Sequence, residues 1–184
     1  MIDENIAVFD HLVDDHDFDA DDIGLFGCSA GGHLALAVSN ELRNRGKAIP
    51  GSVVANSPMI DFTMTNDTWI TLEGQDPVIA REAYVRKVLK ILGIENYRDP
   101  VISPNLDPNL ADGMPPTLIQ TGGKEMLLSD SLVMFQALEA AGQTAKLDLY
   151  DGMPHCFPYI YPDSKEGKAA IAKQVAWFQE YLDL

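Results

Sequence analysis

Cysteine is scarce in this sequence. The 184 residues include only Cys28 and Cys156, which are too few for a secreted disulfide framework and lack the paired spacing of a zinc site. Cys28 precedes Ser29, and Cys156 follows His155. A Cys28–Cys156 disulfide is the alternative if Ser29 and His155 meet, but close backbones do not ensure the Cβ geometry that the bond needs. We therefore expect two free thiols and no metal site.

Basic residues and long apolar runs are also few. The chain has 13 Lys and Arg against 28 Asp and Glu, for a formal net charge of −15. Such a surface repels phosphate backbones and anionic membranes, so nucleic acid is not an expected partner.

The longest unbroken apolar run is the five residues 34–38, and no basic start precedes an apolar stretch. Neither a membrane span nor a signal peptide is predicted, and we expect a soluble, cytoplasmic protein.

The acidic residues cluster without the pattern of a calcium loop. Six aspartates lie between Asp14 and Asp22. A loop counted from Asp15 or from Asp17 would have no glycine at its sixth position and no glutamate at its twelfth. The segment is therefore predicted to be a solvated acidic turn.

Helical and strand-like periods alternate along the chain. This alternation predicts a mostly parallel sheet flanked by helices, and the length favours a single α/β domain over residues 1–184. The last strand alternates apolar with polar residues, which is typical of a strand near a sheet edge. Apolar spacing predicts helices around 2–13, 34–42, 78–92, 128–138 and 171–182, and strands at 23–26, 53–55, 117–121 and 145–150.

A glycine-rich turn follows the first predicted strand and precedes a predicted helix. The segment Gly27-Cys28-Ser29-Ala30-Gly31-Gly32 has the G-x-S-x-G context of a nucleophile elbow. Gly27 and Gly31 would remove Cβ atoms that collide around Ser29, and the Ala30 N–H would point toward a developing oxyanion. The alternative is a turn used only for helix-to-strand packing.

Nucleotide-binding loops fit the glycines poorly. The elbow glycines do not give G-x-G-x-x-G, and Gly122-Gly123-Lys124 is followed by Glu125 where a P-loop requires Ser or Thr. No nucleotide cofactor is expected.

A serine nucleophile needs a histidine and a carboxylate. His155 comes directly after the last predicted strand, whereas His11, His16 and His33 fall in helices or in the acidic turn. Glu125 follows the strand at 117–121 by a short glycine turn, which gives the chain order Ser, acid, His. Asp130 is the second candidate for the acid, but it falls in the next predicted helix, where a carboxylate also suits the helix dipole.

These motifs together resemble the hormone-sensitive-lipase-like branch of the α/β hydrolases, a family of carboxylesterases and acetyl esterases. The resemblance implies Ser29 as nucleophile, Glu125 as acid, His155 as general acid and base, and no cofactor. From these roles our leading hypothesis is hydrolysis of small, uncharged carboxylic esters through an acyl-enzyme. The resemblance spans nearly the whole chain and rests on residues 27–32, Ser57-Pro58-Met59-Ile60-Asp61, Ser103-Pro104, Pro115-Pro116-Thr117-Leu118-Ile119 leading to Gly122, and Gly152-Met153-Pro154-His155.

The sequence departs from that family before the elbow. The His-Gly-Gly-Gly oxyanion segment, its neighbouring strands and the N-terminal cap helices have no counterpart here, so the chain resembles the C-terminal part of the fold. Losing one oxyanion donor costs ~10²–10³ in rate. The strand at 23–26 would be an open edge, which predicts a dimer or other homo-oligomer. The alternative function is a truncated or inactive homologue that serves as a binding or assembly module, or that needs a complementing segment.

Overall fold

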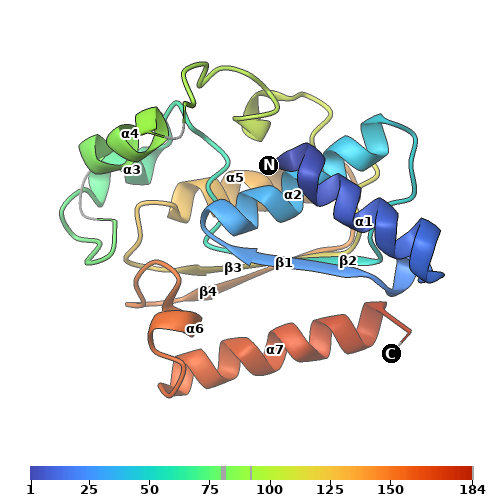
Figure 1. Cartoon of the computed structure of the whole chain (residues 1–184). Helices are drawn as coiled ribbons and strands as arrows, with labels where there is room; N and C mark the ends of the chain where they lie inside the picture. The colour runs from blue at the N-terminus through green and yellow to red at the C-terminus, as the bar shows by residue number, and fades with distance from the viewer. Residues whose placement is uncertain (80–81, 92, 184) are drawn as a thin grey trace.

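Four strands form one parallel sheet in the order of the chain. The computed structural model describes residues 1–79, 82–91 and 93–183. Neighbouring strands pair in the order β1-β2-β3-β4, and each pair is parallel. The predicted parallel sheet is confirmed, and the last strand lies at an edge as expected (Figure 1). The strands are β1 (Gly24–Cys28), β2 (Ser52–Asn56), β3 (Thr117–Gly122) and β4 (Ala145–Tyr150).

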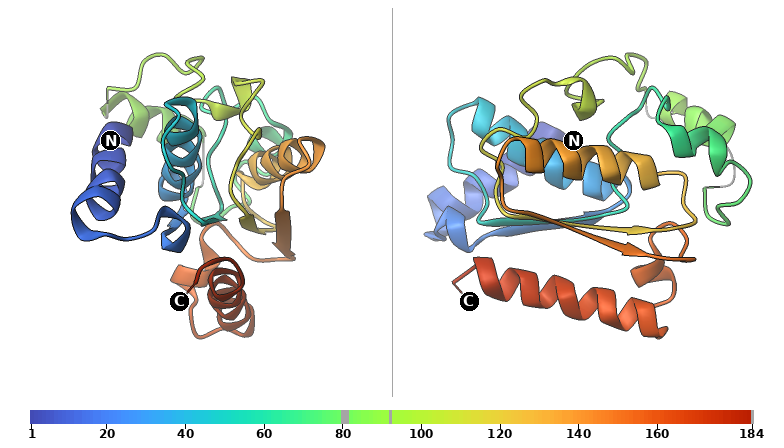
Figure 2. Two further views of the ribbon diagram at one scale, coloured as in Figure 1. Left: turned by 90° about the vertical axis from the view of Figure 1, so that its right-hand side faces the viewer. Right: turned by 180° about the vertical axis from the view of Figure 1, so that it is seen from behind.

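Helices cover both faces of this sheet. One face carries α2 (Ala30–Asn44) and α5 (Leu128–Ala140), with α1 (Ile2–His16) packed beside α2. The other face carries α7 (Lys165–Tyr181), as Figure 2 shows from two further sides. The helices predicted around 2–13, 34–42, 128–138 and 171–182 are confirmed as α1, α2, α5 and α7.

The apolar sides of these elements form the core. Between the sheet and the α2/α5 layer, the side chains of Leu36, Ile119 and Leu138 are fully buried. On the opposite face, Trp177 packs against Val54 and Leu118. Both faces are apolar because parallel strands are buried on both sides. Among the described residues, no helix has the length and apolar content needed to cross a bilayer.

Short helices gather beyond the carboxyl ends of the strands. The sequence did not predict α3 (Asp67–Thr71) or α6 (Phe157–Ile160), which are too short for an apolar period to develop. The helix predicted over 78–92 is α4 (Glu82–Ile91); residues 80, 81 and 92 lie outside the described chain. Its predicted start at Val78 is wrong, because Asp76 Oδ1 accepts the amides of Val78 and Ile79 in a turn.

Candidate active site

Ser29 lies in the turn between β1 and α2 and has an unusual backbone. Its φ of 60° falls in the left-handed region, which costs a non-glycine residue ~1–3 kcal/mol and persists only where the surroundings impose it. The Ser29 amide donates to the Asn56 carbonyl at 2.9 Å, which ties this turn to the end of β2. The predicted strand-turn-helix context is confirmed.

Gly27 and Gly32, rather than Gly27 and Gly31, provide the room for this turn. A Cβ at Gly27 would lie 2.3 Å from the carbonyl carbon and oxygen of Gly31. A Cβ at Gly31 would meet no heavy atom within 4 Å, so the steric need expected there is wrong. At Gly32 a Cβ would lie 3.2 Å from the Asn56 carbonyl oxygen. The close approach is made by the backbone of Gly31, against which Gly27 packs.

Ala30 is the first residue of α2. The amides of the first helical turn have no acceptor within their own helix, and the helix dipole adds partial positive charge there. The Ala30 N–H therefore suits an anion that forms beside Ser29.

The carboxylate of Glu125 is fully buried in the turn between β3 and α5. Its Oε2 accepts hydrogen bonds from Ser57 Oγ at 2.8 Å and from the Gly122 amide at 3.1 Å. Its Oε1 lies 3.9 Å from Nδ1 of His155. That separation is an ion-pair distance and is longer than a hydrogen bond, but catalytic hydrogen bonds often tighten only when substrate binds.

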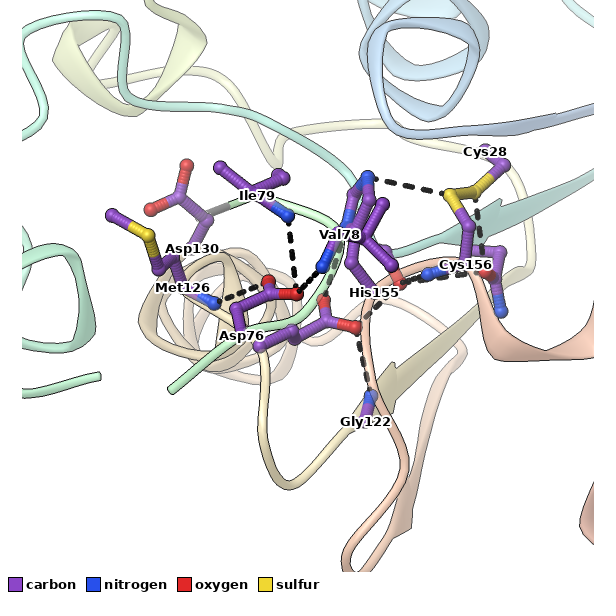
Figure 3. A network of polar contacts seen from close by, with 12 residues as sticks. Cys28, Asp76, Val78, Ile79, Gly122, Met126, Asp130, His155 and Cys156 are labelled. Atoms are coloured by element: carbon purple, nitrogen blue, oxygen red, sulfur yellow. Dashed lines mark hydrogen bonds and ion pairs between the residues drawn. A yellow bond between two sulfur atoms is a disulfide. The ribbon is translucent and has the colours of Figure 1, made fainter. Parts of the chain in front are cut away.

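His155 lies in the loop after β4 and is 4% exposed. This loop turns back across the sheet edge, and Figure 3 shows His155 next to the disulfide between Cys28 and Cys156. The structure thus brings Glu125 and His155 together, and it brings the residue after His155 to the residue before Ser29.

Ser57 is the member of this cluster that the sequence analysis did not identify. Its Oγ donates to Glu125 Oε2 and accepts from the Cys156 amide at 3.2 Å. One hydroxyl therefore joins the segments that follow β2, β3 and β4. The available signal was its position directly after a buried strand, where a polar side chain reaches the carboxyl edge of a parallel sheet.

The expectation of two free thiols is wrong. Cys28 and Cys156 form a disulfide with a Cα–Cα distance of 6.1 Å, which lies within the usual range for such bonds. The pairing depends on the path of the β4 loop across the strand ends, which spacing in the sequence does not show.

Three potential metal ligands, Cys28, His155 and Cys156, have atoms within 4.8 Å of one another. Because both sulfurs are in the disulfide, neither is a thiolate that could hold a metal ion.

Asp130, the second candidate for the acid, lies in α5 as predicted but has other partners. Its Oδ2 accepts the amides of Ile60 and Asp61, and its Oδ1 accepts side-chain donors from Asn66 and Trp69. Burial raises its pKa to about 7, against the opposing effect of these donors. The carboxyl holds the segment after β2 against α5. Both of its oxygens are hydrogen-bonded to residues other than His155.

The remaining histidines lie in helices. His11 and His16 are exposed in α1, where their Nε2 atoms are 3.2 Å apart. The turn predicted from Asp14 is wrong over residues 14–16, because α1 continues to His16. His33 is buried in α2, its ring 4.9 Å from that of Phe62 between centroids. Burial lowers the pKa of His33 to about 4, so this ring is neutral near neutral pH.

Ser29 and Ala30 are among the residues that line a mostly apolar cavity of about 460 Å³. Its volume falls within the range of small-molecule sites, and an apolar lining suits a hydrocarbon group. Ser29 is thus one of the few polar residues in the lining of an apolar pocket. The wall is formed mainly by side chains of α4 and neighbouring loops, including Met59, Phe62, Val85, Leu89, Ile94 and Ile102.

A family model for the alpha/beta hydrolase fold matches residues 1–159. The chain belongs to the alpha/beta hydrolase fold family. An esterase of Acinetobacter venetianus is 34% identical over 170 residues, which are 89% of this chain and 53% of that protein. An acetyl-hydrolase of Streptomyces hygroscopicus is 30% identical over 149 residues, which are 81% of this chain and 49% of that protein.

Solved structures place this alpha/beta hydrolase beside the hormone-sensitive lipase branch. An esterase of the bacterial hormone-sensitive lipase family matches with a TM-score of 0.90 at 33% identity, over 98% of this chain and 60% of that one. A hormone-sensitive lipase from a metagenome library matches with a TM-score of 0.89 at 28% identity, over 98% and 61%. The resemblance inferred from the motifs is confirmed. The chain spans about half the length of the curated relatives that it matches.

Replacing Gly27 with alanine tests the packing of this alpha/beta hydrolase at the elbow. The new Cβ would overlap the Gly31 backbone, and overpacking of this kind costs about 1–3 kcal/mol. We expect Gly27→Ala to lower the free energy of unfolding, measured by denaturant titration, by at least that amount. Gly31→Ala is the matched control, since its Cβ would enter open space. Alanine there is expected to be neutral or to stabilise α2 by up to ~1 kcal/mol. Equal stabilities for the two variants would contradict the steric account.

Proposed function

We propose that this alpha/beta hydrolase is a serine hydrolase of small carboxylic esters, with Ser29, Glu125 and His155 as its catalytic triad. The observation that carries the proposal is the cluster at the carboxyl edge of the sheet: a serine of positive φ in the lining of an apolar cavity, and a buried carboxylate 3.9 Å from a buried imidazole. The names of the relatives, esterase and acetyl-hydrolase, support the same chemistry.

The proposed reaction has two steps. His155 takes the proton of the Ser29 hydroxyl as the Ser29 oxygen attacks the ester carbonyl carbon. The tetrahedral intermediate collapses, the alcohol leaves with the proton from His155, and the acyl group stays on Ser29. Water then attacks the acyl-enzyme by the same proton relay and releases the acid. Glu125, fixed by Ser57 and Gly122 through Oε2, presents Oε1 to the imidazole and favours the tautomer with the proton on Nδ1.

The oxyanion of the intermediate would be held by the Ala30 amide. Hydrogen-bond donors aimed at this oxygen act strongly because the site excludes water. The resembled family draws further donors for this oxygen from a His-Gly-Gly-Gly segment, and each such donor is expected to be worth ~10²–10³ in rate.

The cavity supports small, uncharged acyl groups as substrates. Most of the described residues that line it are apolar, and burying an unpaired charge against them would be costly. A single domain over residues 1–184 and a cytoplasmic location remain predictions from the sequence.

Labelling by a fluorophosphonate probe tests the nucleophile directly, because the probe reacts only with a serine activated by its neighbours. Intact-mass analysis is expected to show one adduct on the parent chain and none on Ser29→Ala. Ser39→Ala is the matched control: Ser39 lies on α2, and its hydroxyl donates to the Ala35 carbonyl of the same helix. It is expected to label like the parent. A folded parent chain without an adduct would overturn the proposed activity.

A second candidate function, assembly through an open sheet edge, is favoured by β1. Within the described residues β1 pairs with β2 alone, so its outer edge is unpaired. Phe26 in the middle of this strand is 63% exposed. A groove beside it is lined by α1, β1 and α2, with Val8, Leu12 and Leu34 among its side chains. An apolar unpaired edge favours pairing with another chain, and we propose a second copy as that chain.

Replacing Phe26 with lysine tests this assembly, since charged side chains on edge strands oppose edge-to-edge pairing. By size-exclusion chromatography with light scattering, we expect a dimer for the parent and a monomer for Phe26→Lys. Ile70→Lys, which changes a 71% exposed residue on α3, is the control and is expected to stay dimeric. A monomeric parent would contradict the proposal, and an esterase-active dimer would exclude a purely structural role.

A further inference from the structure

The disulfide joins the two sequence neighbours of the proposed nucleophile and base. Cys28 immediately precedes Ser29, Cys156 immediately follows His155, and the two cysteines lie 128 positions apart in the chain. The bond therefore links the turn after β1 to the loop after β4, although these strands lie at opposite edges of the sheet. These are the only cysteines in the sequence, so any thiol chemistry of the protein is concentrated at this position.

The bond also lies against the imidazole. Nε2 of His155 is 3.4 Å from Sγ of Cys156, while Nδ1 on the other side of the ring is directed at Glu125 Oε1. In the proposed reaction Nε2 is the atom that takes the serine proton. A disulfide sulfur has no proton to donate, and it is only a weak hydrogen-bond acceptor. The closed bond therefore leaves Nε2 available as a base.

We propose that the Cys28–Cys156 disulfide positions Ser29 and His155 for ester hydrolysis, and that opening it switches the activity down. The inference rests on the proposed function and adds redox control to the same site. Cys28 and Cys156 are positioning residues in this account, because they act through the backbone and ring of their neighbours.

Opening the bond requires a thiol reductant, and a small dithiol is the simplest. One thiolate of the dithiol attacks a sulfur of the bond, and its second thiol resolves the mixed disulfide. The dithiol is oxidised to its own disulfide, while Cys28 and Cys156 take up two electrons and two protons as thiols. Reoxidation reverses the exchange and restores the bond.

The freed thiols would compete for His155. A thiol beside an imidazole readily forms a thiolate–imidazolium pair, and the ligand atoms of Cys28, Cys156 and His155 all lie within 4.8 Å. With Nε2 protonated by such a pair, His155 cannot accept the proton of Ser29. The reduced state is therefore expected to contain a thiolate beside the imidazolium, and Ser29 is expected to react slowly in it.

The loop that carries His155 would also lose a restraint. Cys156 has a φ of 52°, a left-handed conformation that its surroundings must impose. With the bond open, the hydrogen bond from the Cys156 amide to Ser57 Oγ is left to hold this residue near β2. A displacement of about 1 Å in such a site costs ~10²-fold in rate. In an oxidising compartment the bond would be a permanent brace, and in a reducing one it would be a switch.

The test compares oxidised, reduced and reoxidised protein, with peptide mapping by mass spectrometry to establish the state of the bond. We expect reduction by dithiothreitol to lower kcat and the rate of fluorophosphonate labelling by ~10–100-fold with little change in KM, and reoxidation to restore both. Thermal unfolding of each form shows whether the reduced protein is still folded at the assay temperature. Thiolate absorbance across a pH titration of the reduced protein reports the thiol–imidazole pair independently of activity.

The double variant Cys28→Ala/Cys156→Ala is the matched control, because it has neither bond nor thiol. Its labelling rate is expected to be the same with and without dithiothreitol, and lower than that of the oxidised parent. Equal rates for the folded oxidised and reduced parent would overturn the switch while leaving the proposed esterase intact. An equal slowing of the double variant by the reductant would also overturn it. No labelling in either state would overturn the proposed function, and the switch with it.

Discussion

The buried carboxylate of Glu125 is the group around which the carboxyl edge of the sheet is organised. A charge taken out of water is tolerated only when it is paired and hydrogen-bonded. Oε2 of Glu125 meets this requirement with the Ser57 hydroxyl and the Gly122 amide, while Oε1 lies 3.9 Å from the ring of His155, at an ion-pair distance without a hydrogen bond. These partners come from the ends of β2 and β3 and from the loop after β4. Satisfying one carboxylate therefore fixes three segments that are far apart in the chain.

The parallel sheet makes this convergence available. Because all four strands run the same way, their carboxyl ends lie at one edge, and polar residues that follow them are brought together. The turn after β1 is joined to this cluster by the Ser29 amide on the Asn56 carbonyl and by the disulfide. The apolar cavity lies beside this edge, because Ser29 and Ala30 join side chains of α4 and its flanking loops in its lining. A polar cluster next to an apolar pocket is the combination that ester chemistry requires.

The sequence predicted those features that depend on local pattern. Apolar periodicity identified the four strands and the longer helices, and the glycine turn predicted the elbow at Ser29. The sequence did not predict contacts between distant segments. The partner of Cys28 depends on the path of the β4 loop, and the role of Ser57 depends on a carboxylate 68 residues away. The steric need assigned to Gly31 was misplaced, because its own backbone is what Gly27 must accommodate. The start predicted at Val78 failed because residues 77–79 form a bend, in which Asp76 Oδ1 accepts the amides of Val78 and Ile79.

The turnover of Glu125→Gln measures what the buried carboxylate contributes to catalysis. A glutamine keeps the shape of the side chain, but it removes the charge that orients and stabilises the imidazole. Glu139→Gln, on the exposed side of α5, makes the same chemical change away from the site. The account predicts a fall in kcat of about 10³–10⁴-fold for Glu125→Gln on a folded protein, with Glu139→Gln close to the parent. Equal turnover of the two variants would contradict the role of the buried carboxylate.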